Sequence, residues 1–246
     1  MKRRHEMIES SAMGRRVHVW CFGHWGKPVM IFPTAAGFAH EWDRQGMVDA
    51  LAPLIYAGKI KLYCPESNVS QTLTDKTTHP KIRMARHKAY ERFVLDDLVP
   101  AIRKDCRSQE IRIATAGASL GAFYAANAAL KQPEIFDYAL CLSGRYSLTH
   151  FTGGYSDDDV YFNNPIAFTS NLGGEALERV QGKTHLTLVC GQGKWEEGCI
   201  EETHLLANIL EAKDIPHDRD IWGHDVSHDW LWWKRQTLYH LNRVFG

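Results

Sequence analysis

The chain lacks an excess of charge of either sign. Its 29 lysines and arginines are matched by 29 aspartates and glutamates, so the formal net charge is zero. Proteins that gather DNA, RNA or an anionic membrane surface through a global field carry a marked basic excess. We therefore expect a small-molecule substrate, and neither nucleic acid nor a membrane as a partner.

A long apolar run is also missing. No segment has the length and apolar character of a membrane span, and the basic residues 1–6 lead into polar residues instead of the apolar core of a signal peptide. The sequence therefore predicts a cytoplasmic protein.

Cysteine pairs with metal-binding or redox spacing are absent too. The six cysteines are scattered with no CxxC motif, and four of them lie in or beside strand-like segments. We expect most of them to be reduced thiols in the core: Cys21, Cys64, Cys106, Cys141, Cys190 and Cys199. No dinucleotide fingerprint, P-loop or zinc ligand set is present, so no cofactor is expected.

No low-complexity linker divides the 246 residues, which have the length and apolar content of one α/β domain. Strand-like and helix-like segments alternate, which predicts a mostly parallel central sheet covered by helices on both faces. In such a sheet, ligands bind at the carboxyl ends of the strands. Strands are expected at residues 16–22, 28–32, 60–64, 111–116, 136–142, 185–190 and 218–222, and helices at about 47–56, 84–104, 122–132, 201–212 and near the C-terminus.

Residues 148–172 interrupt this alternation. They have weak periodicity and contain Gly-Gly, Asp-Asp-Asp and Asn-Asn-Pro clusters. We expect a small insertion over the sheet, near the active site, with aromatic side chains that belong either to a pocket wall or to the core. Asp157, Asp158 and Asp159 are most simply a solvated loop tip, with calcium as a weak alternative.

The most informative stretch is Gly117-Ala118-Ser119-Leu120-Gly121. A Gly-x-Ser-x-Gly pentapeptide between a strand and a helix forms a tight turn that exposes a serine nucleophile. The serine backbone is strained in such a turn, and small flanking residues let the strand and the helix approach each other. A β-branched segment precedes this pentapeptide and an alanine-rich helical segment follows it, so Ser119 is the candidate nucleophile.

A serine hydroxyl needs a histidine base, and that histidine needs a carboxylate to orient it. In this type of fold the chain order is serine, acid, histidine. His224 and His228 lie after the last expected strand, and we choose His228 because it stands just ahead of the C-terminal helix. A zinc site on these two histidines is a minor alternative, because the segment between them lacks the glutamate of His-Glu-x-x-His and Gly223 indicates a loop.

The acid is expected in the loop 191–198, where Glu196 and Glu197 are the only carboxylates. We prefer Glu196 and keep Glu197 as the alternative. Glu201 and Glu202 are better explained as first-turn residues of a helix, where the helix dipole favours negative charge.

Acyl transfer also needs hydrogen-bond donors for the oxyanion. The backbone N–H after the nucleophile, that of Leu120, is one expected donor, and the loop 34–37 supplies the second, for which we choose Ala35. Trp195 and Trp230 are candidate substrate contacts because their side chains would add apolar surface to a pocket wall.

The sequence resembles the putative esterase family of α/β hydrolases, whose relatives include esterase D, feruloyl and enterochelin esterases and mycolyltransferases. The resemblance covers nearly the whole chain and is carried by residues 11–15, 26–34, 117–121, 161–165 and 223–230, with the His-Asp-Trp-x-x-Trp ending as its most specific element after the pentapeptide. It implies Ser119 as nucleophile, His228 as base and Leu120 as an oxyanion donor. Many relatives place an aspartate soon after the glycine that ends the acid strand, and this chain has a glutamate on a slightly longer loop.

Together these features predict a serine carboxylesterase with a single α/β-hydrolase domain over residues 1–246 and an acyl-enzyme on Ser119. Two alternatives remain open. The first is an acyltransferase or thioesterase that uses the same three residues. The second is a non-catalytic binding module, against which the ordered set of serine, glutamate and histidine argues. The chain is also rich enough in aromatic residues that an exposed aromatic patch could mediate a homo-oligomer.

Overall fold

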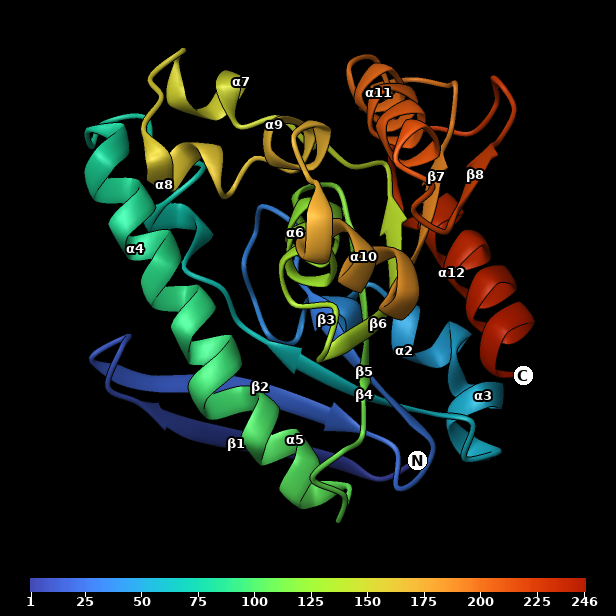
Figure 1. Ribbon diagram of the computed structural model, residues 1–246. Helices are drawn as coiled ribbons and strands as arrows, with labels where there is room; N and C mark the ends of the chain where they lie inside the picture. The colour runs from blue at the N-terminus through green and yellow to red at the C-terminus, as the bar shows by residue number, and fades with distance from the viewer.

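The computed structural model describes residues 1–246 and contains one eight-stranded sheet in the order β1-β2-β4-β3-β5-β6-β7-β8 (Figure 1). The strands β1 and β2 form an antiparallel hairpin, β2 is antiparallel to β4, and all remaining neighbours are parallel. The strands are β1 (Arg3–Ser10), β2 (Arg15–Phe22), β3 (Lys27–Phe32), β4 (Ile60–Pro65), β5 (Ile113–Ala118), β6 (Phe136–Leu142), β7 (His185–Cys190) and β8 (His217–Ile221).

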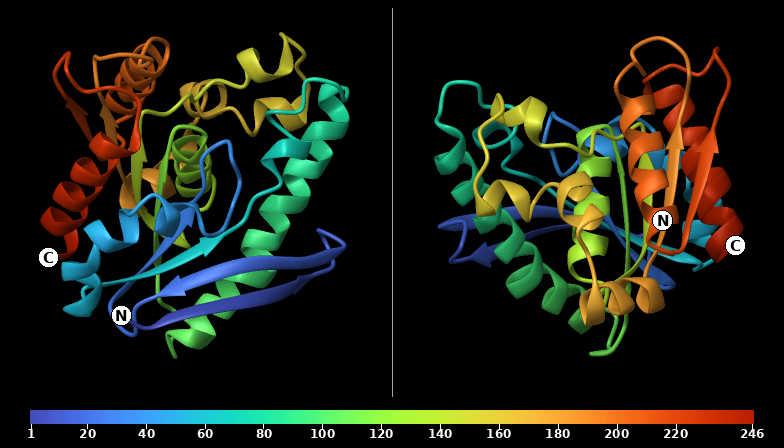
Figure 2. Two further views of the ribbon diagram at one scale, coloured as in Figure 1. Left: turned by 180° about the vertical axis from the view of Figure 1, so that it is seen from behind. Right: turned by 45° about the horizontal axis from the view of Figure 1, so that its top comes forward.

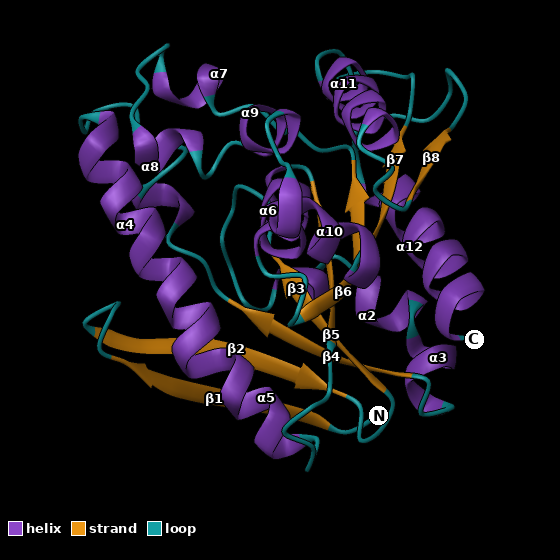
Figure 3. Cartoon of the chain, in the orientation of Figure 1, coloured by secondary structure: helices purple, strands orange, loops and turns teal.

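Helices cover both faces of this sheet (Figures 2 and 3). They are α1 (Glu41–Arg44), α2 (Met47–Ala50), α3 (Ala52–Tyr56), the 3-10 turn η1 (Val69–Gln71), α4 (Pro80–Arg92), the π-helical stretch η2 (Phe93–Leu98), α5 (Val99–Asp105), α6 (Leu120–Lys131), α7 (Thr149–Thr152), α8 (Asp158–Tyr161), α9 (Pro165–Ser170), α10 (Gly174–Lys183), α11 (Cys199–Ala212) and α12 (Trp230–Phe245). Helices α4, α5, α6 and α11 share one apolar cluster with the sheet, and α1 to α3 and α12 share another. The predicted fold class, a mostly parallel sheet between two helical layers, is therefore confirmed.

Most expected elements are present with shifted ends. The strands at 136–142 and 185–190 have the predicted bounds, whereas β5 begins and ends two residues later than expected. The expected helix 84–104 is a continuous helical run from Pro80 to Asp105 whose middle is π-helical. Pro100 lies just beyond the π stretch and cannot donate a backbone hydrogen bond, which accounts for the irregularity.

Strand β1 was not expected from the sequence. Its residues alternate between exposed and half-buried, and it forms the edge of the sheet beyond β2. Such an edge strand has no continuous apolar run, so its pattern is weaker than that of the buried strands.

The predicted helix 47–56 also differs from the structure, because this segment forms two short helices, α2 and α3, joined at Leu51.

Residues 148–172 form three short helices, α7, α8 and α9, above the sheet between α4 and α11 (Figure 1). Phe168 is buried and three of the other aromatic side chains pack partly against the core, whereas Phe162 is exposed. Asp157 caps α8 by accepting a hydrogen bond from the Val160 amide at 2.9 Å, and Asp159 pairs with Lys88 at 2.8 Å. The acidic tip therefore has structural partners within the chain.

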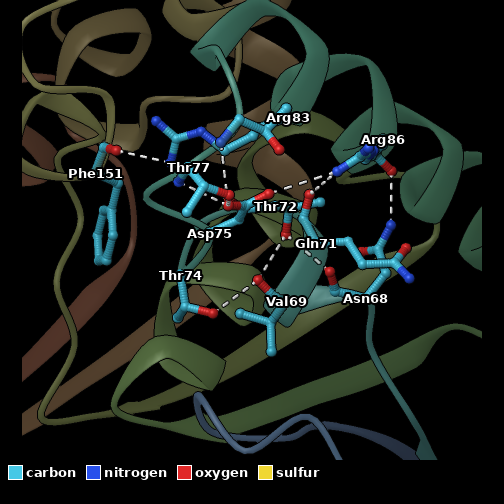
Figure 4. A network of polar contacts seen from close by, with 11 residues as sticks. Asn68, Val69, Gln71, Thr72, Thr74, Asp75, Thr77, Arg83, Arg86 and Phe151 are labelled. Atoms are coloured by element: carbon cyan, nitrogen blue, oxygen red, sulfur yellow. Dashed lines mark hydrogen bonds and ion pairs between the residues drawn. The ribbon is translucent and has the colours of Figure 1, made fainter.

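A polar network fastens the loop between β4 and α4 to this segment (Figure 4). The Arg83 guanidinium donates to the carbonyl oxygen of Phe151 at 3.0 Å, and Arg86 lies 3.6 Å from the Asp75 carboxylate. The Asn68 side-chain amide donates to the carbonyl oxygen of Arg86 at 2.8 Å. These contacts join α4 to the loops at the carboxyl edge of the sheet, where the candidate site lies.

None of the helices combines the length and the apolar character that a membrane crossing requires.

Candidate active site

Ser119 lies in the tight turn between β5 and α6. Its φ of 55° is in the left-handed region, which costs a non-glycine residue backbone energy. The Ser119 amide donates to the carbonyl oxygen of Leu142 on β6 at 2.8 Å, which fixes the turn to the neighbouring strand. The serine side chain is half-buried at the carboxyl edge of the sheet.

Two glycines make this turn possible. A Cβ atom on Gly117 would lie 2.3 Å from the carbonyl oxygen of Gly121, and a Cβ atom on Gly121 would lie 2.4 Å from the carbonyl oxygen of Phe32. Both distances are far below van der Waals contact, so larger residues would push the helix away from the strands. The second contact also brings the loop after β3 against the start of α6.

The loops that follow β7 and β8 pack backbone to backbone. The Gly193 amide donates to the carbonyl oxygen of Val226 at 2.8 Å, and the His228 amide donates to the carbonyl oxygen of Lys194 at 3.1 Å. A Cβ atom on Gly191 would lie 2.1 Å from the same Val226 oxygen, so glycine is required for this approach. The two loops therefore hold the predicted acid and the predicted base in a fixed relation.

The three predicted side chains form one hydrogen-bonded series. The His228 Nε2 atom is 3.0 Å from the Ser119 Oγ atom, and the His228 Nδ1 atom is 3.1 Å from the Glu196 Oε2 atom. If Nδ1 carries the proton and donates to Glu196, Nε2 is free to accept the serine proton, which is the arrangement that nucleophilic catalysis needs.

Glu196 and Glu197 differ sharply in environment. The Glu196 side chain is 1% exposed and Glu197 is exposed to solvent. Trp195, directly before them, has a φ of 67° and ends a turn in which the Glu196 amide donates to the carbonyl oxygen of Gly193 at 3.3 Å. This turn directs Glu196 inward, and Glu196 rather than Glu197 makes the hydrogen bond with His228.

Glu196 has a second partner that the sequence did not indicate. The Ser143 hydroxyl donates to Glu196 Oε1 at 2.6 Å and accepts from the Trp233 indole N–H at 3.0 Å. Ser143 is fully buried directly after β6, with a φ of 50°. A serine at the end of an apolar strand is common, so only its position at the carboxyl edge of the sheet could have drawn attention to it.

The loop after β3 is fixed by a buried carboxylate. Glu41 is 6% exposed and accepts hydrogen bonds from the Thr34 amide at 2.7 Å and from the Thr34 hydroxyl at 2.6 Å. Burial raises the pKa of Glu41, and the hydrogen bonds from Thr34 oppose this in part. Ala35, the predicted oxyanion donor, follows Thr34 and is exposed, and its amide makes no hydrogen bond within the chain.

The other predicted site residues lie in different settings. Trp195 is 62% exposed, with the Lys194 ammonium 4.0 Å from the ring centroid, whereas Trp230 is half-buried and packs edge-on against Trp233. His224 is exposed and belongs to no cluster of metal-ligating side chains, so the His224 and His228 zinc pair is not supported by the structure.

Cys199 is a further residue that the sequence did not single out. Its Sγ atom lies 3.9 Å from His228 Nδ1, at the start of α11. Burial, followed by the charge of Glu196, raises the pKa of Cys199 to about 12, so the thiol is protonated near neutral pH. All six cysteines are free.

The fold is that of the α/β hydrolases, and solved structures with this fold are similar over the full chain. A ferulic acid esterase has 16% identity and a TM-score of 0.79, with 99% of this chain and 98% of that chain covered. S-formylglutathione hydrolase from Staphylococcus aureus has 13% identity and a TM-score of 0.73, with 100% of this chain and 97% of that chain covered. MPT51 from Mycobacterium tuberculosis has 15% identity and a TM-score of 0.74, with 100% of this chain and 98% of that chain covered.

The family model described as "Putative esterase" matches residues 41–242, and the chain belongs to this family. It is therefore a hydrolase that acts on esters. The resemblance inferred from the sequence is confirmed. No curated protein sequence matches the chain.

Proposed function

We propose that the protein is a serine carboxylesterase in which Ser119 attacks the ester carbonyl, His228 accepts the serine proton and Glu196 orients His228. The observation that carries this proposal is the unbroken series of contacts at 3.0 Å and 3.1 Å from the serine hydroxyl through the imidazole to the buried carboxylate. A positive charge that develops on His228 during attack is stabilised by Glu196, because both groups are shielded from water.

The reaction proceeds through an acyl-enzyme. His228 passes the serine proton to the departing alcohol, which leaves the acyl group on Ser119. Water then attacks this ester while His228 Nε2 accepts its proton, and His228 returns that proton to the Ser119 oxygen as the carboxylic acid is released. The amides of Leu120 and Ala35 stabilise the oxyanion in both steps, a role supported by the free amide of Ala35 and by the position of Leu120 as first residue of α6.

Trp195 and Trp230 are proposed as substrate contacts of different kinds. Trp195 is exposed beside the loop that carries Glu196 and offers an aromatic face for the ester, with Lys194 stacked on its ring. Trp230 is half-buried and offers the substrate only its exposed part, while its ring packs edge-on against Trp233, whose ring centroid lies 4.8 Å from that of His228.

Thioester hydrolysis is a second candidate, favoured by the similarity to S-formylglutathione hydrolase over 100% of this chain. An oxygen ester and a thioester present the same carbonyl to Ser119 and differ only in the leaving group. Parallel assays with acyl esters and acyl thioesters that share one acyl group separate the two activities by their kcat/KM values.

The test compares hydrolysis of short-chain p-nitrophenyl esters by the wild type and by Ser119→Ala, His228→Ala, Glu196→Gln and Glu197→Gln. We expect loss of turnover by at least about 1000-fold in the first two variants and a marked loss in Glu196→Gln. Glu197→Gln is the matched control and should retain wild-type activity. Equal activity of the two glutamine variants would contradict the role of Glu196. A wild type that hydrolyses no ester and no thioester would contradict the proposal that this site is catalytic.

A further inference from the structure

Cys199 places a buried thiol beside His228 that the proposed hydrolysis does not use. Its Sγ atom is 3.9 Å from His228 Nδ1, and the same Nδ1 atom is 3.1 Å from Glu196 Oε2. Sulfur, nitrogen and oxygen donors therefore converge behind the imidazole, on the side away from Ser119.

The spacing of these donors fits a tetrahedral cation. The three ligand atoms lie within 4.8 Å of one another, and no other set of three His, Cys, Asp or Glu side chains in the chain does so. Zinc bonds of about 2.0–2.3 Å at tetrahedral angles place nitrogen about 3.4 Å from oxygen and about 3.6 Å from sulfur. The observed nitrogen–oxygen and nitrogen–sulfur separations of 3.1 Å and 3.9 Å are within about 0.3 Å of these values, and the oxygen and sulfur atoms lie within 4.8 Å of each other.

We propose that zinc binds to Glu196, Cys199 and His228 Nδ1 and reversibly inhibits the enzyme. The binding site stands on geometry alone, whereas the inhibitory effect rests on the proposed function. Three protein ligands with a water in the fourth position are typical of zinc sites that keep one coordination position open. Among divalent ions, zinc suits a mixed set of thiolate, imidazole and carboxylate, whereas magnesium and calcium require oxygen ligands.

Charge and protons balance on binding. The Cys199 thiol releases its proton to solvent, and the proton on His228 Nδ1 is exchanged through solvent to Nε2. One thiolate and one carboxylate then neutralise the divalent cation, so the buried site carries no net charge.

This binding mode explains inhibition directly. An imidazole that is metallated at Nδ1 and protonated at Nε2 has no lone pair with which to accept the Ser119 proton. Because Glu196 then binds zinc, it no longer accepts a hydrogen bond from His228. Turnover should therefore stop while zinc is bound and return when a chelator removes it.

The first experiment measures ester hydrolysis against zinc sulfate concentration, followed by addition of EDTA. The test variant is Cys199→Ala, and Cys199→Ser replaces it should it fail to fold. The control is Cys64→Ala, because the Cys64 thiol of the wild type is also buried, on β4. Each rate is divided by that variant's own rate without zinc. We expect the inhibitory concentration to rise at least about 100-fold in the Cys199 variants and to stay unchanged in the control.

The second experiment needs no catalysis. Cobalt(II) added to the wild type and to Ser119→Ala should give a thiolate-to-cobalt charge-transfer band that is absent in the Cys199 variants. Equal zinc sensitivity with and without Cys199, no inhibition of an active wild type, or no charge-transfer band would each overturn the proposal. If no ester is hydrolysed, the proposed function fails, while the cobalt band still decides whether the metal site exists.

Discussion

Glu41 accepts hydrogen bonds from both donors of Thr34, the amide N–H at 2.7 Å and the hydroxyl at 2.6 Å. The carboxylate is 6% exposed, and Thr34 directly precedes the predicted oxyanion donor Ala35. The orientation of the Ala35 amide thus depends on a carboxylate that does not contact the reacting serine.

Glu41→Ala should lower kcat/KM by about 10- to 100-fold, because a displaced oxyanion donor no longer meets the transition state. Glu41→Gln should retain most of the activity, since its carbonyl accepts from the Thr34 amide and its NH2 group donates to the Thr34 hydroxyl oxygen. Steady-state kinetics with one p-nitrophenyl ester distinguish the variants. Equal loss in both would show that the charge of Glu41, and not the hydrogen bonding, matters.

Ser143 is expected to act as a positioning residue for Glu196. Ser143→Ala removes the donor that lies 2.6 Å from Glu196 Oε1, and a hydrogen bond to a charged group is worth about 1.5–3 kcal/mol. We expect kcat to fall about 10-fold with KM little changed, because a carboxylate that has lost this contact orients His228 less well. Trp233→Phe should lower kcat by less. A Ser143→Ala enzyme with reduced stability but an unchanged kcat would refute this role.

The proximity of Ser119 and His228 could be predicted from the sequence, whereas contacts that arise only through packing could not. Ser119 stands in a recognisable pentapeptide and His228 follows the last strand, so their order along the chain was enough to expect the contact that the structure has at 3.0 Å. The choice between Glu196 and Glu197 depends on the backbone turn at Trp195, whose φ of 67° no local pattern reveals. Ser143 and Cys199 become neighbours of Glu196 and His228 only when β6 and α11 pack against the loop after β7.

The same distinction applies to the fold. Buried parallel strands such as β6 and β7 are continuous apolar runs and were found with exact bounds, whereas the half-exposed edge strand β1 was missed. The cytoplasmic location, the bounds of the insertion at 148–172 and the oligomeric state stay predictions.

Gly121→Ala should disrupt the turn. The added Cβ atom would lie 2.4 Å from the carbonyl oxygen of Phe32 and 2.8 Å from that of Pro33, and backbone atoms cannot move aside as a flexible side chain can. We expect the free energy of unfolding to fall by at least about 2 kcal/mol and esterase activity to be lost. Gly182→Ala, where the added atom meets nothing within 4 Å in helix α10, is the control and should be neutral or slightly stabilising. Urea unfolding of both variants provides the measurement.

Asp105 should make the fold sensitive to acid. Burial alone would raise the pKa of Asp105, but hydrogen bonds from Lys61, Tyr63 and Arg4 outweigh it and lower the pKa from 3.8 to about 2. Because the pKa is lower in the folded state, this contribution to stability is complete above about pH 4 and is lost as the pH falls toward 2.

Asp105→Asn should therefore be less stable than the wild type at pH 7, with a difference that narrows below pH 4. Asp49→Asn serves as the control, because the Asp49 side chain is 75% exposed. Urea unfolding at a series of pH values checks this, and a constant difference between pH 7 and pH 3 would show that the ionised form of Asp105 has no special role.

The central claim is that His228 activates Ser119, and covalent labelling tests it most directly. Wild type, Ser119→Ala and His228→Ala are treated with a fluorophosphonate, and the adduct is located by mass spectrometry of peptides. We predict one adduct per wild-type chain, on Ser119, with none on Ser119→Ala and labelling slowed by at least about 1000-fold in His228→Ala. An adduct on another residue, or labelling of His228→Ala at the wild-type rate, would contradict the account.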